Sequence, residues 1–357
     1  MAFLTLNRIK LQENFKFLKD LFEENDISWG VVSKIFCGNR KFLKELIDLG
    51  VAEIHDSRIS NLAKIKEISP EIQTVYIKPV SKRNIPKMVK FADVSLNSEL
   101  NTIRWISAEA ANQSKIHKII IMVETGDLRE GVIGDHIVDF YEKIFDLPNI
   151  EIIGLGTNLN CLNGVMPSTD KLIQLSLYKQ IIELKFNKDI PWVSAGTSVT
   201  IPLMQNKQLP KGVNHFRVGE TLYFGVDLFE EKIIPGMHSD VFELNAEIIE
   251  MQEKPLLPTG ALAANPQGET IEIDQSLYGL TSFRAILDIG LLDIEPKYLI
   301  PIDLDFEILG ASSDMLILNL GLNPKGYKVG DLIKFNLKYM GALGIMNSSY
   351  VDKVIIT

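Results

Sequence analysis

One lysine and several clusters of small polar residues are the groups in this sequence that could carry out chemistry. Lys34 ends the short apolar run WGVVSK at residues 29–34. An amine that is partly removed from water holds its proton less tightly, which allows it to form an imine with a carbonyl compound. Taken alone, a lysine at the end of an apolar run is more often a rim residue whose stem covers apolar neighbours. The clusters elsewhere in the chain decide between the two interpretations.

Three polar segments each follow an apolar run. They are ETGDLREG at 124–131, GLGTNLNC at 154–161 and SAGTS at 194–198. The first could be a solvated turn with a local ion pair. The second supplies uncharged hydrogen-bonding groups that suit a planar polar ligand.

The third segment and the stretch that follows it have the composition of a phosphate site. Gly196 allows the backbone to approach an anion, Thr197 and Ser198 offer hydroxyls, and the next predicted strand carries Arg217 and Gly219. Backbone N–H groups, hydroxyls and a helix N-terminus are the usual ligands of phosphate. Capping of the next helix would explain the two hydroxyls equally well. It would not explain Lys34.

An imine-forming lysine and a phosphate site together suggest one cofactor. Pyridoxal 5'-phosphate carries an aldehyde at one end and a phosphate at the other, so Lys34 and the 196–198 segment match its two ends. The sequence therefore predicts a pyridoxal-phosphate site, provided that the fold brings the two segments together.

The elements that would position these residues alternate between short strands and amphipathic helices, as in a parallel sheet wrapped by helices. Helical spacing of apolar residues is clear at 11–25 and 40–49. Eight strands are predicted, at 29–34, 52–56, 73–78, 93–96, 118–124, 151–156, 192–196 and 215–219. We therefore expect a TIM (β/α)8 barrel, in which active-site groups lie at the carboxyl ends of the strands. A doubly wound open sheet is the alternative, but no G-x-G-x-x-G segment follows the first strand.

From Met237 onward the pattern changes to short β-rich runs separated by Pro and Gly, with no long helix. We expect a C-terminal all-β domain at 237–357 after a barrel domain at 1–236.

Composition restricts the partners of the protein. The 357 residues are 46% hydrophobic and 23% charged, with a net charge of -9 and two cysteines, Cys37 and Cys161. This acidic balance argues against nucleic acid and anionic membranes, and the scarcity of cysteine suits a reducing, cytoplasmic compartment. The histidines show no ligand-like spacing, so no metal is expected; His55 is interpreted as a hydrogen-bonded rim residue.

Over its whole length the chain resembles the alanine-racemase-like, fold-type-III pyridoxal-phosphate enzymes, and within them the ornithine racemase group. The segments that carry this resemblance occur in both halves of the chain: LNRIKLQENF, VVSKIFCGN, VETGDLREGV, GLGTNLNCLNGV, SAGTSVTIPL, FRVGETLYFG, ILGASSDMLILNL and YKVGD. The resemblance implies an amino-acid racemase that acts on ornithine or another basic amino acid.

The resemblance also implies roles for individual residues. Lys34 would hold the cofactor and transfer one proton, and Arg129 would contact the cofactor's phenolic oxygen. Arg217 would face the pyridine nitrogen; because a guanidinium keeps its proton near neutral pH, that nitrogen would stay unprotonated, which limits side reactions. Arg217 could instead pair with a carboxylate inside the barrel. The phosphate ligands would be Thr197, Ser198 and the backbone N–H groups of Gly219 and Glu220.

Two departures from the alanine racemases concern catalysis. Their second-domain tyrosine is missing, since the corresponding stretch is Gly290-Leu291-Leu292-Asp293-Ile294. Racemisation needs a proton donor on each face of the reacting carbon, so another group must replace it. The side-chain candidates are Cys161, Cys37, Tyr278 and Tyr339, and bound water is a further possibility. In addition, Asn158 stands where alanine racemases place a histidine against the cofactor ring.

A loop of the second domain bears on the quaternary structure. Ser312, Ser313 and Asp314 resemble the loop that, in alanine racemases, reaches the partner's active site and binds the substrate carboxylate, and Cys161 is a further candidate contact for the substrate. This implies a head-to-tail homodimer with shared active sites. A β-domain packed only on its own barrel is the alternative.

Two other functions remain open at the sequence level. One is a decarboxylase of the same fold type, against which stands the absence of an H-G-S-G-like phosphate segment. The other is a cofactor-carrying protein without turnover, against which stands the long second domain.

Overall fold

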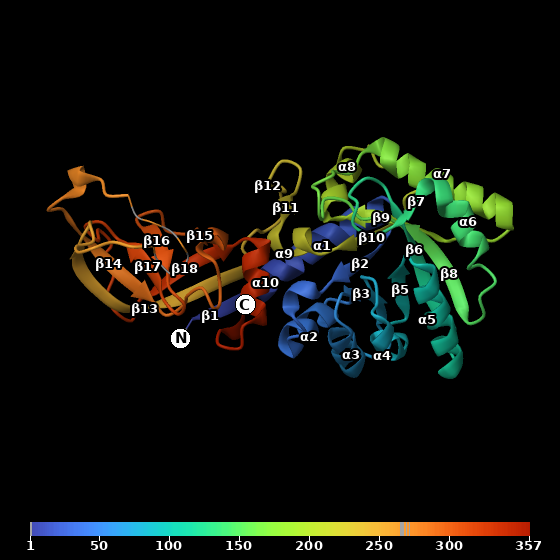
Figure 1. The fold of residues 1–357 in the computed structure, drawn as a ribbon, viewed down its shortest axis with the longest axis horizontal. Helices are drawn as coiled ribbons and strands as arrows, with labels where there is room; N and C mark the ends of the chain where they lie inside the picture. The colour runs from blue at the N-terminus through green and yellow to red at the C-terminus, as the bar shows by residue number, and fades with distance from the viewer. Residues whose placement is uncertain (1, 265–267, 269, 271) are drawn as a thin grey trace. The chain divides into compact units, whose positions relative to one another are not determined.

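The structure is a computed structural model that describes residues 2–264, 268, 270 and 272–357. It divides into two compact units: Asn7–Val241 forms one, while the residues up to Leu6 join Phe242–Ile356 in the other. Figure 1 labels the elements.

The first unit is a closed barrel of eight parallel strands. In chain order the strands are β2 (Ser28–Val32), β3 (Glu53–Asp56), β4 (Gln73–Tyr76), β5 (Val94–Asn97), β6 (His117–Glu124), β8 (Ile150–Gly156), β9 (Trp192–Thr197) and β10 (His215–Val218). Each strand pairs with the next, and β10 pairs with β2 to complete the ring. All eight strands predicted from the sequence are confirmed.

Helices alternate with the strands and cover the outside of the barrel (Figure 1). They are α1 (Arg8–Glu24), α2 (Arg40–Asp48), α3 (Ile59–Ile68), α4 (Ile85–Phe91), α5 (Leu100–Asn112), α6 (Ile137–Glu142), α7 (Thr169–Phe186), α8 (Ile201–Gln205) and α9 (Glu220–Phe224). Helix α1 shows how a helix packs on the barrel through its apolar face. Its buried residues include Leu11, Phe15, Leu18 and Phe22, as helical spacing predicts. Short pairs also occur, β7 (Val132–Ile133) beside β6, and β11 (Val226–Asp227) with β12 (Lys232–Ile233).

The interior of the barrel is apolar on one side and polar on the other. An apolar cluster lies along four consecutive strands of the ring, β4, β5, β6 and β8, and fills this side of the interior. Its members are Val75, Val94, Leu96, Ile120, Met122 and Ile153. The interior beside β2, β3, β9 and β10 instead holds polar side chains, which the next section describes.

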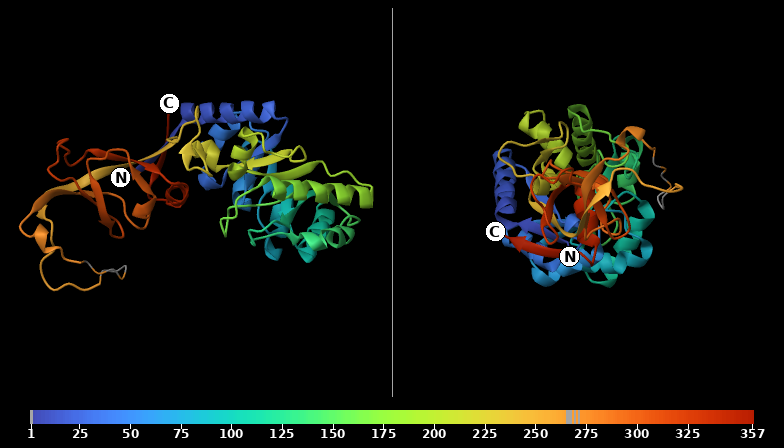
Figure 2. Two further views of the ribbon diagram at one scale, coloured as in Figure 1. Left: turned by 90° about the horizontal axis from the view of Figure 1, so that it is seen from above. Right: turned by 90° about the vertical axis from the view of Figure 1, so that its left-hand side faces the viewer.

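The second unit is built on an antiparallel sheet. Its strands are β1 (Phe3–Asn7), β13 (Phe242–Pro255), β14 (Thr281–Leu287), β15 (Leu299–Pro301), β16 (Glu307–Ala311), β17 (Leu316–Asn319), β18 (Leu332–Leu337) and β19 (Asp352–Ile356). The strands nearest the two ends of the chain, β1 and β19, pair with each other in this unit (Figure 2).

The antiparallel sheet confirms the expected C-terminal β domain, to which the structure adds one helix, α10 (Tyr339–Asn347), in which Gly341 lies against Tyr298. The two compact units divide at Val241–Phe242, a few residues after the predicted boundary at Gly236. The physical reason is that His238 still binds the barrel, through reciprocal hydrogen bonds of 2.7 and 2.8 Å with Asn14 of α1.

Among the described residues, no helix combines the length and the apolar character that crossing a membrane requires.

Candidate active site

Lys34 lies directly after β2, at the carboxyl end of the barrel strands. It begins a short 3-10 helix, η1 (Lys34–Phe36), and its side chain is half-buried. The preceding residue, Ser33, donates a hydrogen bond of 2.8 Å to Asp56 at the end of β3. Lys34 is close enough to affect the pKa values of Asp56, Cys161 and Glu220. The lysine therefore stands among ionisable groups from several strand ends, which is where this fold places catalysis.

Asp127 ties together the loops that follow β6 and β8. Its carboxylate accepts backbone hydrogen bonds from Cys161, Leu162, Asn163 and Val165, at 2.9 to 3.3 Å. Burial alone would raise the pKa of Asp127, but these four N–H groups outweigh it and lower the pKa. The loop that carries Cys161 is thus fixed to the loop that carries Arg129.

A chain of hydrogen bonds runs from this loop into the barrel. Arg129 pairs with Glu130, and Glu130 accepts a bond of 2.8 Å from the amide of Asn158. The Asn158 oxygen accepts a bond of 3.0 Å from Arg217. Three residues predicted from the sequence, Arg129, Asn158 and Arg217, are therefore joined through Glu130, which the prediction did not include.

Arg217 is a buried cation in the polar side of the barrel interior. Its guanidinium donates to the backbone oxygen and the hydroxyl of Ser194, each at 2.5 Å, and to the backbone oxygen of Thr157 at 2.6 Å. Burial lowers the pKa of Arg217 to about 10. The group still carries its proton at neutral pH, so it can donate a hydrogen bond to a ligand but cannot accept one.

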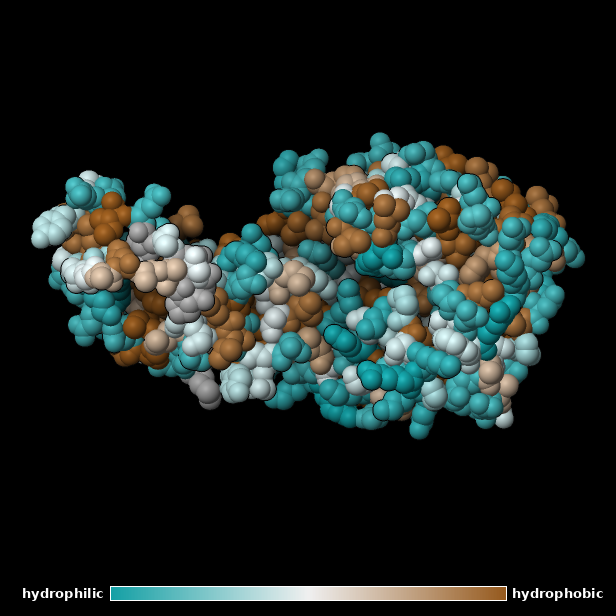
Figure 3. All heavy atoms as spheres, viewed as in Figure 1, coloured by the Kyte–Doolittle hydropathy of each residue, from teal (hydrophilic) through white to brown (hydrophobic). Residues whose placement is uncertain are grey.

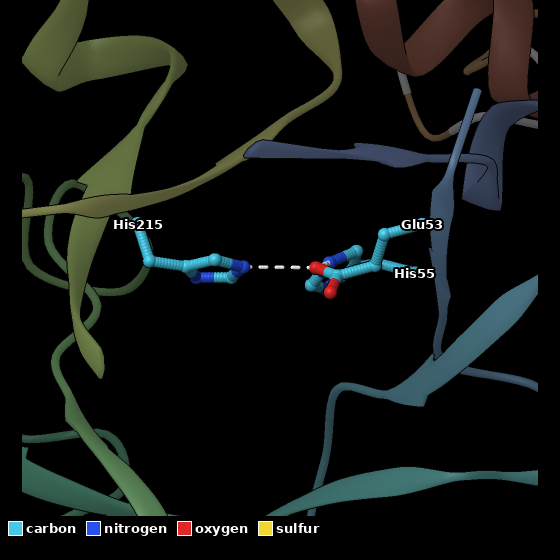
Figure 4. A group of neighbouring side chains, drawn as sticks. All are labelled: Glu53, His55 and His215. Carbon is cyan, nitrogen blue, oxygen red and sulfur yellow. Dashed lines mark hydrogen bonds and ion pairs between the residues drawn. The ribbon is translucent and has the colours of Figure 1, made fainter. Parts of the chain in front are cut away.

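Ser194 connects Arg217 to a buried cluster of Glu53, His55 and His215, which Figure 4 shows. Ser194 Oγ is 2.6 Å from His215 Nδ1, and His215 Nε2 is 2.9 Å from Glu53 Oε1. His55 Nε2 bonds to the same carboxylate oxygen. Burial opposes ionisation of Glu53, but both imidazoles favour it, and its pKa is lowered well below the ordinary value. An ionised Glu53 therefore supplies a negative charge within the same buried network as the Arg217 cation.

This cluster corrects two statements about histidine. His55 is fully buried inside the barrel and is not a rim residue. His55 and His215 lie together with Glu53 in a geometry that could hold a metal ion, although their spacing along the chain gave no sign of it. Closure of the barrel places β3 and β10 on either side of β2, and this brings Glu53 and His55 into contact with His215. Each imidazole bonds to Glu53 through its Nε2 atom, whereas the buried Nδ1 atom of His55 has no partner among the described residues.

The proposed phosphate ligands lie at the ends of β9 and β10. Ser198 Oγ accepts hydrogen bonds from the backbone N–H groups of Gly219 and Thr221, at 3.4 and 3.2 Å. Gly219 is the N-cap residue of α9, and Glu220 is the first residue of that helix. The side chain of Thr197 caps η4 (Ser198–Thr200), so the capping role considered for it is present. These groups form a cluster of hydroxyls and N–H donors at one edge of the barrel mouth.

The donor set fits pyridoxal phosphate. Hydroxyls and N–H groups near Ser198 suit a phosphate, Lys34 supplies an amine, and buried Arg217 supplies a proton donor for a ring nitrogen. Space at the phosphate end is tight: a Cβ on Gly219 would lie 3.1 Å from Val32. A side chain at residue 219 would therefore press against β2.

The substrate-binding candidates Ser312, Ser313 and Asp314 lie in the second unit, between β16 and β17. The backbone N–H groups of Leu291 and Leu292 donate to the backbone oxygens of Ser312 and Ser313, each at 2.9 Å. The segment in which the tyrosine is missing is therefore directly attached to the candidate carboxylate-binding loop. Of the other proton-donor candidates, Cys37 follows η1, and Tyr278 and Tyr339 belong to the second unit.

The prediction from sequence missed three carboxylates: Glu53, Asp56 and Glu130. Asp56 could have been found, because it is the last residue of a predicted strand and such positions face the barrel mouth. Glu130 lies inside a segment that was recognised, but its partner Asn158 belongs to a different loop. Glu53 is the first residue of its strand, whereas active-site residues are expected at the carboxyl end.

Comparisons with known proteins identify the family of this chain. A family model described as alanine racemase, N-terminal domain, matches residues 6–227. The chain is 37% identical over 354 residues to an ornithine racemase of Acetoanaerobium sticklandii, which covers 99% of both chains. It is 29% identical over 352 residues to a lysine racemase of Thermotoga maritima, which covers 98% of this chain and 97% of that one.

Solved structures share the fold at low identity. An alanine racemase of Clostridium difficile 630 in complex with cycloserine superposes with a TM-score of 0.74 at 15% identity, over 99% of this chain and 95% of the other. An alanine racemase of Bartonella henselae with covalently bound pyridoxal phosphate gives 0.74 at 16% identity, over 99% of both chains. The family model spans more than half of the chain and the ornithine racemase spans nearly all of it, so this chain belongs to the alanine racemase family.

Proposed function

We propose that this protein is a pyridoxal-phosphate-dependent amino-acid racemase that interconverts the L and D forms of a basic amino acid, with ornithine as the first candidate. The observation that carries the proposal is the position of the Arg217 cation, which is buried and hydrogen-bonded inside the barrel. Lys34 and Ser198 lie at the ends of strands of the same barrel. An amine, a proton-holding cation and a set of phosphate donors are the three kinds of group that this cofactor requires.

Each of these residues has a distinct task. Bound pyridoxal phosphate supplies the electron-withdrawing group that makes the α-proton of an amino acid acidic. Lys34 holds or returns that proton on one face of the α-carbon. Arg217 keeps its own proton and donates a hydrogen bond, which limits how strongly the ring can withdraw electrons. Thr197, Ser198 and the N–H groups of Gly219 and Glu220 bind the phosphate, and Arg129 contacts the phenolic oxygen.

The choice of a basic substrate rests on the relatives and on charge. The two full-length relatives are an ornithine racemase and a lysine racemase. Asp127, Glu130 and Glu220 bring carboxyl groups to the same end of the barrel as Lys34. Burial raises the pKa of Glu220, and nearby Lys34 opposes that rise. A second ammonium group on the substrate would find opposite charge in this region.

The test is turnover of single enantiomers. Purified protein with added pyridoxal phosphate is incubated with L-ornithine, D-ornithine, L-lysine or L-alanine, and the products are separated by chiral chromatography. We expect each ornithine enantiomer to give a racemic mixture, lysine to react more slowly, and alanine to react slowest. The Lys34→Ala variant should be inactive. Formation of a diamine would show a decarboxylase instead, and the absence of any turnover would indicate a carrier protein.

We further propose a homodimer in which Ser312, Ser313 and Asp314 of one subunit bind the substrate carboxylate in the other. The exposed positions of these side chains support this arrangement. Light scattering would give the mass of the particle, and mixing Lys34→Ala with Asp314→Ala subunits should restore part of the activity that each variant lacks alone.

The remaining proposals concern location and partners. We propose a cytoplasmic enzyme whose partner is its amino-acid substrate, without nucleic acid or membrane. A net charge of -9 and two free cysteines support this proposal. Cell fractionation would test it.

A further inference from the structure

A pocket of about 410 Å³ is lined by residues other than those assigned to racemisation. Its lining comes from the first turns of α3, the end of β4 and the helix α4. Pockets that bind small molecules range from about 300 to 1,000 Å³. The volume is therefore sufficient for a small metabolite.

The alternation of β4 separates this pocket from the barrel interior. Val75 and Ile77 belong to or pack against the apolar cluster inside the barrel, whereas Tyr76 and Lys78 line the pocket. Successive side chains of a strand point to opposite faces. The pocket and the barrel interior thus lie on opposite sides of the same strand.

The charged lining of the pocket is entirely basic. Arg58, Lys78 and Lys87 line it, and no carboxylate does. Within the part of the chain that the structure describes, none of these three side chains takes part in an ion pair or hydrogen bond. Hydrophilic side chains cover the region of α3 and α4 in Figure 3. In a chain with a net charge of -9, three unpaired cations around one hollow favour an anion.

A tyrosine hydroxyl that lines the pocket also lacks a protein partner. Tyr76 is only 3% exposed, yet among the described residues its hydroxyl has no hydrogen bond. Burial raises the pKa of Tyr76, so the group remains a neutral donor at physiological pH. The oxygen is not among the fully enclosed unpaired polar atoms of the described residues, so it can be reached from the pocket. A ligand that accepts a hydrogen bond would satisfy it.

The N-terminus of helix α3 adds an electrostatic field that favours an anion. The helix begins at Ile59 and has ten residues, and its first turn forms one wall of the pocket. The N-terminus of a helix carries partial positive charge and free N–H groups. Ser57 and Ser60 add hydroxyls at the same end.

We propose that this pocket binds a small organic anion, whose phosphate or paired carboxylates contact Arg58, Lys78 and Lys87 and accept a hydrogen bond from Tyr76. The carbon part of the ligand lies against Ile59, Ala63 and Phe91, which complete the lining. None of these residues is assigned a role in racemisation, although the site borders the active site: the backbone N–H of Arg58 donates a hydrogen bond of 2.8 Å to Asp56, which lies near Lys34.

Titration calorimetry on the protein loaded with pyridoxal phosphate tests the proposal. Inorganic phosphate and succinate are titrated separately at low ionic strength, and sodium chloride of matched ionic strength is the control titrant. We expect one saturable site for phosphate, for succinate or for both. A response to phosphate alone indicates a phosphorylated ligand, and a response to succinate alone indicates a dicarboxylate. In the R58Q/K87Q variant the affinity should fall at least tenfold, and in Tyr76→Phe about threefold to tenfold, as expected for one lost hydrogen bond.

The matched control is R104Q/K41Q, which removes the same two charges from exposed positions on α5 and α2. It should bind both anions as the unaltered protein does. Equal binding in R58Q/K87Q and the unaltered protein would place the anion elsewhere and overturn the proposal. An equal response to chloride, or equal losses in both double variants, would overturn it too, because the attraction would then be a general effect of charge.

Discussion

Arg217 Nη2 lies 3.0 Å from the side-chain oxygen of Asn158, which is itself bonded to Glu130 through its amide nitrogen. Asn158 therefore joins a buried cation to a carboxylate from another loop. A histidine at this position, as in the alanine racemases, offers two ring nitrogens in a fixed plane. An amide offers one donor group and one acceptor on a shorter side chain, and both are used here.

Replacing Asn158 with alanine should uncouple these two charged groups. Each would lose a hydrogen-bond partner in a protected site, at a cost of about 1–3 kcal/mol. We expect kcat/KM for racemisation to fall at least tenfold. Steady-state kinetics measure the loss, and Asn112→Ala, on the surface of α5, is the control. Unchanged kinetics in Asn158→Ala would show that the link between Arg217 and Glu130 is dispensable.

Asp127→Asn should loosen the loop after β8. An amide has a single acceptor oxygen, so it cannot hold all four backbone N–H groups that the carboxylate binds. Limited proteolysis should cut within residues 158–165 several times faster than in the unaltered protein, and kcat/KM should fall about tenfold. Asp189→Asn, at an exposed position, controls for the lost charge. Equal cleavage rates in both variants would contradict this prediction.

His117 should make the protein less stable in mild acid. Burial lowers the pKa of His117 to about 4, and its Nε2 lies 2.8 Å from Ser95 Oγ. An unfolded chain has a histidine pKa near 6.5, so between these values the unfolded state binds a proton that the folded state does not. Stability from this group is therefore present above pH 6.5 and is lost as the pH falls toward 4. From pH 7 to pH 5 the loss is about 2 kcal/mol.

Urea unfolding at pH 7 and pH 5 measures this effect. Other groups also titrate in this range, so the comparison is with His117→Gln, whose free energy of unfolding should change less between the two pH values. An identical pH dependence in both proteins would rule out His117 as the source.

Gly196→Ala should destabilise the barrel. A Cβ at this position would lie 2.1 Å from Cγ of the buried Phe216 ring, at the point where β9 meets β10. Overpacking of this kind costs about 1–3 kcal/mol or more. The control is Gly344→Ala in the exposed part of α10, where the nearest atom is at 3.4 Å and alanine should stabilise the helix by about 0.5–1 kcal/mol. Thermal melts that show equal midpoints for the two variants would contradict the steric argument.

The sequence was informative wherever a local pattern determines structure. The eight barrel strands could be predicted because each is a short apolar run, and Lys34, Ser198 and Arg217 could be predicted as site residues because the fold places chemistry at or near strand ends. These inferences need no knowledge of which strands become neighbours.

Contacts between distant segments could not be predicted in the same way. Glu53 meets His215 only because the sheet closes and places β3 and β10 on either side of β2. Asn158 meets Glu130 only because two loops are tied by Asp127. The basic pocket joins Arg58 to Lys87 across two helices, and nothing in either local segment marks it.

The pairing of β1 with β13 and β19 has a consequence for the order in which the molecule is completed. The barrel is one continuous stretch, Asn7–Val241, and can fold once that stretch has left the ribosome. The second unit needs residues from both ends of the chain, so its sheet cannot close until synthesis is nearly finished. Until then β1 has no strand to pair with, because β13 and β19 follow the barrel in the chain. A ribosome that stalls once Val241 has left its exit tunnel should therefore hold a folded barrel with an unpaired first strand.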